Sequence, residues 1–129
     1  MSRSAVVMDR CQGGMSLRLE ARPMGEDWNI SIYGGDRPHI GAAALATPYA
    51  KPDGSWSACA SVLAIPTHKE DVLARQAALL LARRTRRTVL VACGIHVDDL
   101  SPEGIAAFVA LAEEAVEALA QRLAGLQEG

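Results

Sequence analysis

Three histidines stand out as residues that could do chemistry, because the chain has no others and each has polar or glycine neighbours. They are His39, His68 and His96. An imidazole can donate a hydrogen bond, accept one or bind a metal near neutral pH. The histidines are 29 and 28 residues apart, which matches no local metal-binding motif. Whether they share a site therefore depends on the fold.

Each histidine belongs to a short segment that suits ligand binding. The segments are Gly34–Gly41, Thr67–Glu70 and Gly94–Asp98. Glycines let a ligand approach the backbone closely, and a helix N-terminus offers amides to an anion. The candidate cofactor-binding residues are Gly34, Gly35, Arg37, His39, Ile40, Gly41, His68, Lys69, Glu70, Gly94, His96 and Asp98.

Two ligands fit these candidates. A phosphate would sit on the backbone amides of 68–70, with Lys69 or Arg37 adding positive charge. Alternatively, His39, His68 and His96 would bind a divalent metal, with Asp98 or Glu70 as a fourth ligand. A structural interpretation also stands for each residue, since glycines serve in turns and histidines in caps and loops.

The elements that would position these residues follow from hydrophobic periodicity. Alternating or continuous apolar residues predict strands at 16–21, 28–33, 40–47, 56–65 and 88–93. The capping-box spacing of Thr67 and Glu70 predicts a helix from about 68 to 84, and Ser101-Pro102 predicts the start of a last helix. The expected class is α+β, a single mixed sheet in the order ββββαβα with two helices packed on it. We expect one domain over 1–129, with its core at about 10–126.

This order predicts that the three segments meet. Strands 40–47 and 56–65 form a hairpin, and the following helix returns the chain so that strand 88–93 runs parallel to strand 56–65. Strands 28–33 and 88–93 then end at the edge where strand 40–47 begins. All three histidines, the Gly34-Gly35 pair and the Ser101 helix start gather there.

Composition narrows the functional classes. The 129 residues carry a formal charge of −2, which gives no basic field for nucleic acid. No apolar stretch reaches the roughly 20 residues of a membrane span, and the start lacks a signal-peptide core, so we expect a cytoplasmic protein without membrane contact. Cys11, Cys59 and Cys93 form no metal or disulfide pattern. The arginines of 83–87 suit a helix C-terminus.

Three stretches resemble a known family: PHIGAAALA, PTHKEDVLAR and TVLVACGIHVDDLSPEGI. Over about residues 14–120 the chain resembles the LpdD-like prenylated-flavin chaperones associated with UbiD-type decarboxylases, a family in which some members are named as gallate decarboxylase components. The resemblance implies binding of prenylated FMN, or FMN, and its delivery to or maturation for a UbiD-type decarboxylase, with a flavin prenyltransferase as a further partner. The matching positions are 39–41, 68–70, 94–96 and 98.

The leading prediction is therefore a non-catalytic cofactor chaperone. Two alternatives stay open: an enzyme that uses a histidine-bound metal to activate water, and a structural subunit that docks on a decarboxylase through its alanine-rich strands. Small residues on strands 40–47 and 56–65 also favour a homodimer, because another layer can approach them closely.

Overall fold

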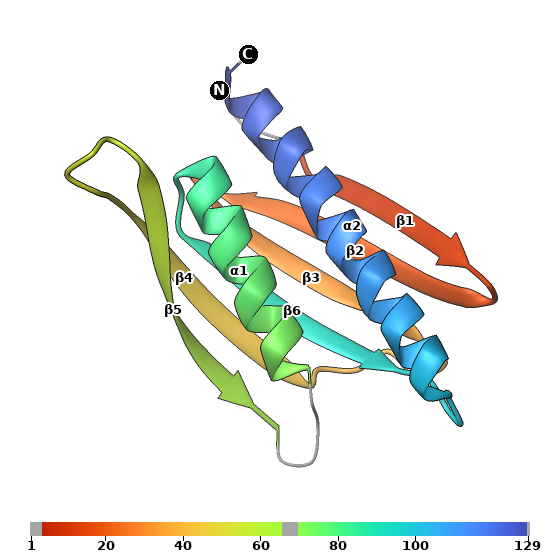
Figure 1. Cartoon of the computed structure of the whole chain (residues 1–129). Helices are drawn as coiled ribbons and strands as arrows, with labels where there is room; N and C mark the ends of the chain where they lie inside the picture. The colour runs from red at the N-terminus through yellow and green to blue at the C-terminus, as the bar shows by residue number, and fades with distance from the viewer. Residues whose placement is uncertain (1–3, 66–69, 129) are drawn as a thin grey trace.

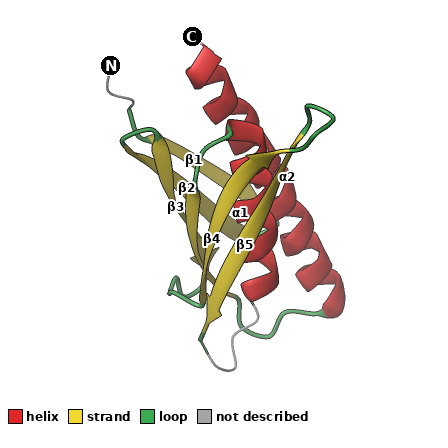
Figure 2. Ribbon diagram, turned by 90° about the vertical axis from the view of Figure 1, so that its left-hand side faces the viewer, coloured by secondary structure: helices red, strands yellow, loops and turns green. Residues whose placement is uncertain are grey.

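A computed structural model describes residues 4–65 and 70–128 and contains a six-stranded sheet with two helices on one face (Figures 1 and 2). This confirms the α+β class with one mixed sheet. The elements are β1 Val6–Gln12, β2 Met15–Met24, β3 Asp27–Gly35, β4 Ala42–Ala50, β5 Trp56–Ala64, α1 Asp71–Thr85, β6 Val89–His96 and α2 Pro102–Glu128. In these residues no helix is long and apolar enough to cross a membrane.

The predicted order lacks β1, which is an edge strand of the sheet and pairs antiparallel with β2. The turn between them is Gly13-Gly14, and both glycines have positive φ angles of 57° and 80°. Two consecutive positive φ angles are the mark of the tight hairpin turn that matches strand twist. The order is therefore βββββαβα, and the hairpin signal was present in the sequence at Gly13-Gly14.

The strands lie in the order β1-β2-β3-β6-β4-β5, so the last strand in the chain is inserted between β3 and β4. It pairs parallel with β3 and antiparallel with β4. The predicted strand directions are correct, since β5 pairs antiparallel with β4 and hence runs parallel to β6. The position of β6 between β3 and β4 was not predicted.

The core lies between the sheet and the helices. Helix α1 covers β4, β5 and β6 and packs on α2, which also contacts β1 and β2. Alternate residues of each strand point to this layer, among them the fully buried Leu19, Ile32 and Val91. Alanines fill both sides of the contact between α1 and β4, for example Ala78 and Ala44, and let the helix lie close to the sheet.

Two boundaries near the site differ from the predicted ones. Helix α1 begins at Asp71 with Glu70 as its N-cap, three residues after the predicted start at 68, and Thr67 of the predicted capping box lies outside the described residues. Strand β6 continues through Gly94 to His96, because Gly94 and Ile95 stay paired with β3. The start of α2 is confirmed: the Ser101 hydroxyl accepts a hydrogen bond from the Gly104 amide at 3.0 Å.

Candidate functional site

The carboxyl ends of β3 and β6 meet the segment that leads into β4. Gly35 is paired with His96, and the Gly41 amide donates to the Cys93 carbonyl at 2.8 Å. Glu70, at the start of α1, reaches the same place by contacting His39. The structure thus brings together segments that lie far apart in the sequence, and the predicted residues among them are Gly35, Arg37, His39, Gly41, Glu70, Gly94, His96 and Asp98.

His39 lies between a carboxylate and a backbone carbonyl. Its Nε2 is 3.1 Å from Glu70 Oε1, and its Nδ1 is 3.0 Å from the Arg37 carbonyl oxygen. Both oxygens accept hydrogen bonds, so an imidazole with hydrogen on both nitrogens satisfies both contacts. The two side chains are mostly buried, with 24% of His39 and 11% of Glu70 exposed, which fixes their orientation.

His96 belongs to a second, more exposed group with Arg37 and Asp98. Its Nε2 is 2.9 Å from Asp98 Oδ1 and 2.6 Å from an Arg37 guanidinium nitrogen, which in turn donates to Asp98 Oδ1 at 2.7 Å. The hydrogen bond from His96 and the charge of Arg37 hold the pKa of Asp98 below its ordinary value. The His39 and His96 rings lie edge to face, with centroids 6.3 Å apart.

Close backbone contacts require glycine at Gly34, Gly35 and Gly94, and the last two lie at the crossing of the 36–41 segment. A Cβ on Gly94 would lie 1.3 Å from the His39 carbonyl oxygen, and one on Gly35 would lie 2.3 Å from the His96 carbonyl oxygen. Gly35 also has a positive φ of 78°. These glycines therefore let the 36–41 segment cross β6 closely, and this crossing places His39 beside His96.

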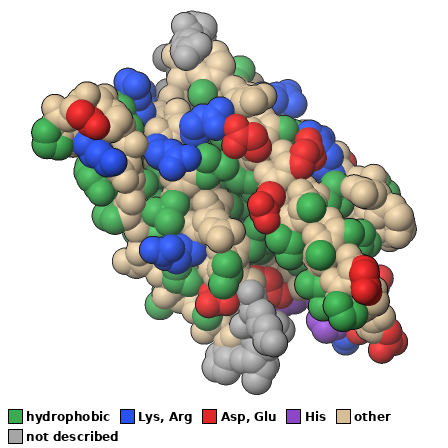
Figure 3. Space-filling view, in the orientation of Figure 1, with side chains coloured by type: hydrophobic (Ala, Val, Ile, Leu, Met, Phe, Trp, Pro, Cys, Tyr) green, Lys and Arg blue, Asp and Glu red, His purple; other side chains and the backbone are tan. Residues whose placement is uncertain are grey.

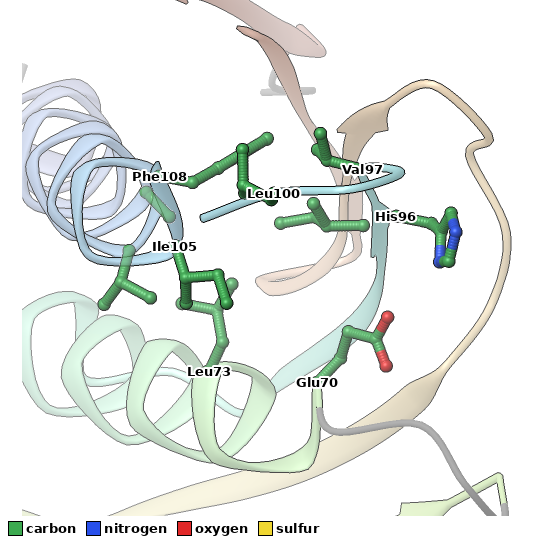
Figure 4. Close-up of a pocket in the computed structure, with 10 residues that line it drawn as sticks. Glu70, Leu73, His96, Val97, Leu100, Ile105 and Phe108 are labelled. Atoms are coloured by element: carbon green, nitrogen blue, oxygen red, sulfur yellow. The ribbon is translucent and has the colours of Figure 1, made fainter. Parts of the chain in front are cut away.

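An apolar pocket of about 400 Å³ lies next to these groups, between the starts of the two helices and the end of β6. In Figure 4 the side chains of Leu73, Leu100, Ile105 and Phe108 converge, whereas Glu70 and His96 lie to one side. This volume is in the range of small-molecule pockets. The lining residues are Glu70, Leu73, Ile95, His96, Val97, Leu100, Ile105, Phe108, Val109 and Ala112.

The predicted site did not include this apolar wall. The helical spacing of Ile105, Phe108, Val109 and Ala112 predicts that they belong to the core-facing stripe of the last helix. Phe108 and Ala112 are buried, whereas Ile105 is 53% exposed and Val109 47% exposed. The signal was available, because the stripe begins within the first turn of the helix, beside the edge where the histidines gather.

Some predicted residues are not part of the described arrangement. His68 and Lys69 lie outside the described residues, and so does the predicted phosphate cradle at 68–70 apart from Glu70. Ile40 is 68% exposed, and Gly34 lies opposite Ile95 in the sheet rather than at its edge. Within 4–65 and 70–128, no three His, Cys, Asp or Glu side chains are grouped as a metal site.

Charge is separated along the molecule. Figure 3 shows the histidines beside acidic side chains at the lower right end, whereas most basic side chains lie in the upper half. There, Arg84 pairs with Glu117 at 2.5 Å and Arg87 pairs with Glu26 at 3.0 Å. Arg83 and Arg84 occupy the last turn of α1, where positive charge offsets the helix dipole. Arg84 and Arg87 therefore have structural partners away from His39 and His96.

Comparison with known proteins begins from the fold. A solved structure described as a novel chaperone complex for yeast 20S proteasome assembly has a TM-score of 0.58 and 14% identity, over 92% of this chain and 98% of that one. At this identity the likeness shows the fold alone. Among curated proteins, none matches the sequence. A family profile described as the prenylated flavin chaperone LpdD-like domain matches residues 11–124. The chain therefore belongs to the LpdD-like family of prenylated flavin chaperones.

Proposed function

We propose that this protein binds prenylated FMN and holds it for a UbiD-type decarboxylase, without catalysing a step itself. Membership of a prenylated flavin chaperone family supports the cofactor class. The observation that carries the proposal is the apolar pocket beside the histidine and carboxylate groups. The pocket lies at the end of the molecule where the starts of both helices meet the end of β6.

The pocket suits a flavin enlarged by a prenyl-derived ring. Its wall is made of aliphatic side chains and one aromatic ring, Phe108, which is 5% exposed and therefore fixed in place. An apolar wall favours the added hydrocarbon ring through its removal from water. Glu70 and His96 line the same pocket and supply polar atoms for the flavin ring edge.

Arg37 is the described residue best placed to add charge for the cofactor phosphate. Its side chain is 66% exposed and already pairs with an anion, Asp98. A phosphate would compete with that carboxylate, because guanidinium binds both in the same forked geometry. On this proposal, riboflavin, which lacks the phosphate, binds more weakly than FMN.

The roles of the protein's own groups are those of binding and shielding. The reactive chemistry of decarboxylation belongs to the cofactor once it is seated in the acceptor enzyme. Here the apolar wall excludes water from the ring, and Glu70, which is held by its contact with His39, lines one side of the pocket. A flavin prenyltransferase is the proposed donor and a UbiD-type decarboxylase the acceptor.

The direct test is to purify the protein after co-expression with a flavin prenyltransferase and to record its absorption spectrum. We expect a flavin spectrum and, after mixing with cofactor-free decarboxylase, gain of decarboxylase activity. A colourless protein that takes up neither FMN nor prenylated FMN would contradict the proposal. Co-purification with the decarboxylase in the absence of flavin would favour the structural-subunit alternative.

The pocket itself is tested by Ile105→Glu. The side chain is 53% exposed at the pocket, so the change leaves folding nearly intact but places a carboxylate against the apolar ring. We expect at least about a tenfold loss of affinity for prenylated FMN, measured by fluorescence titration. The matched control is Leu126→Glu, at a position 49% exposed near the other end of α2. Equal affinities of the two variants would place the flavin elsewhere.

A further inference from the structure

The sheet has a second face that no helix covers (Figure 2). On β1 and β2 this face carries charged side chains, Asp9, Arg18, Glu20 and Arg22, which form ion pairs with one another. On the other four strands it carries charged or ionisable groups of this kind only at strand ends, Asp27 at the start of β3 and His96 at the end of β6, and none between them. We call this part the uncharged face; its residues are Asn29, Ser31, Tyr33, Ala43, Leu45, Thr47, Tyr49, Ser57, Cys59, Ser61, Leu63, Leu90 and Ala92.

The centre of the uncharged face is apolar and exposed. Leu45 lies opposite Leu90, and Ala43 lies opposite both Ala92 and Leu63, so these five side chains form neighbouring rows across three strands. Leu45 is 49% exposed, Leu90 37% and Leu63 80%. Contiguous exposed apolar patches on a protein surface often mark interaction sites.

We infer that a second copy of this chain covers the uncharged face. Two such surfaces do not repel each other, because the only titratable side chain in the residue set above other than tyrosine is the Cys59 thiol. Their shapes also match: open sheets stack face to face about 10 Å apart, and the small side chains of Ala43, Ala92 and Ser61 permit that approach. A second copy of the chain offers both an uncharged surface and a flat sheet of the same shape.

The size of the face fits a stable dimer. Four strands about 4.8 Å apart and about nine residues long give roughly 30 by 19 Å of flat sheet. Side-chain relief raises the accessible area above this flat value, toward the roughly 800 Å² that each partner buries in a standard interface. The flavin pocket lies on the opposite, helix-covered side, so this contact leaves it open. The inference does not depend on flavin binding.

Leu45→Glu tests the inference, with Val7→Glu as its matched control. Val7 is 48% exposed and lies on the same side of the sheet, but on β1, three strands away from β6. We expect the wild-type protein to sediment as a dimer and Leu45→Glu to weaken the dimer at least about 100-fold, because it buries a charge on both sides. Val7→Glu should keep the wild-type dissociation constant, and circular dichroism should show both variants folded.

A second readout needs no mutation. Cys59 lies within the uncharged face and Cys11 lies on β1, and both thiols are exposed in the monomer. Maleimide labelling of Cys59 should slow as protein concentration passes the dissociation constant, whereas labelling of Cys11 should not change. A wild-type chain that stays monomeric overturns the inference, as does equal dissociation of the Leu45→Glu and Val7→Glu dimers. Protection of Cys59 only on adding the decarboxylase would also overturn it and assign the face to that enzyme.

Discussion

His96 faces two partners through a single nitrogen. Its Nε2 is close to both the Arg37 guanidinium and Asp98 Oδ1, at 2.6 and 2.9 Å. That nitrogen either carries a hydrogen and donates to Asp98, or presents its lone pair and accepts from Arg37. A ligand phosphate that draws Arg37 away would therefore leave His96 to donate to Asp98. Arg37 can thus exchange Asp98 for the ligand anion while Asp98 keeps its hydrogen bond with His96.

The carboxyl of Asp98 gives a pH-dependent test of this group. Its pKa lies below the ordinary 3.8, first because His96 hydrogen-bonds to it and then because of the charge of Arg37. A lowered folded-state pKa stabilises the protein above about pH 4 and loses this contribution as pH falls through the folded-state value. We expect NMR titration to show Asp98 ionising below 3.8 and Arg37→Ala to move its pKa upward. An unchanged Asp98 pKa in that variant would contradict the contact.

At the residue scale, much of the site was predictable and its wall was not. Gly35, His39, Gly94 and His96 were predicted at one edge because strand directions alone bring their segments together. The pairing of Glu70 with His39 was not predicted, since the spacing of Thr67 and Glu70 matches a capping box and local patterns do not show longer-range partners. Phe108 is buried as the apolar stripe predicts, but Ile105 and Val109 of the same stripe are half-exposed at the pocket, because an apolar stripe looks the same whether it meets a sheet or a pocket.

At the element scale, the 36–41 segment joins β3 to β4 by crossing the end of β6, and it carries His39 to the site. Gly41 donates its amide to β6, and its own carbonyl accepts from the Ile65 amide at 2.9 Å. The crossing therefore extends the sheet hydrogen bonds beyond the first residue of β4. Because His39 is held by this backbone, its position depends on the fit between the segment and β6 rather than on a flexible loop.

Gly94→Ala tests that fit. The new Cβ would meet the His39 carbonyl oxygen, so the backbone of the crossing segment must move. We expect unfolding to become easier by about 1–3 kcal/mol, as for other overpacked sites, together with weaker flavin binding. The control is Gly125→Ala on α2, where an added Cβ meets nothing within 4 Å and should stabilise the helix slightly. A wild-type denaturation midpoint for Gly94→Ala would show that the crossing is looser than described.

Elements with a strong internal period were predicted well, and those set by distant partners were not. The α2 start was predicted because Ser101 and Pro102 act locally. Strand β1 is short and carries a charged residue on each side, Asp9 and Arg10, so its pattern is weak and its pairing with β2 defines it as a strand. Strand β6 continues past the glycine that was expected to end it, because β3 stays paired with Gly94, Ile95 and His96.

At the scale of the whole molecule, one strand joins two otherwise separate sheets. Strands β1 to β3 form one antiparallel unit and β4 with β5 another, and only β6 pairs with both. The order of strands along the sheet was beyond the sequence pattern, since the period of β6 shows that it is buried but not which neighbours it has. The inserted strand also makes the parallel pair that brings Gly35 beside His96.

A shortened chain tests the role of β6 in the molecule. A chain that ends at Thr88 keeps both hairpin units and α1 but lacks the strand that joins them. We expect no cooperative transition on denaturant unfolding, because neither unit buries a core without α2 and β6. Far-ultraviolet circular dichroism and fluorescence of Trp28, fully buried in the intact protein, are the measurements. A sharp transition with a buried Trp28 would show that the first unit folds alone.

The late position of β6 also sets the sequence of events when the chain is made. The ribosome completes β1 through β5 and α1 before it begins the strand that belongs at the centre. Until then β3 and β4 each have an unpaired edge, and unpaired edges invite pairing between nascent chains. A protein that serves as a chaperone for a cofactor therefore passes through a stage of synthesis in which its own chain needs protection from aggregation.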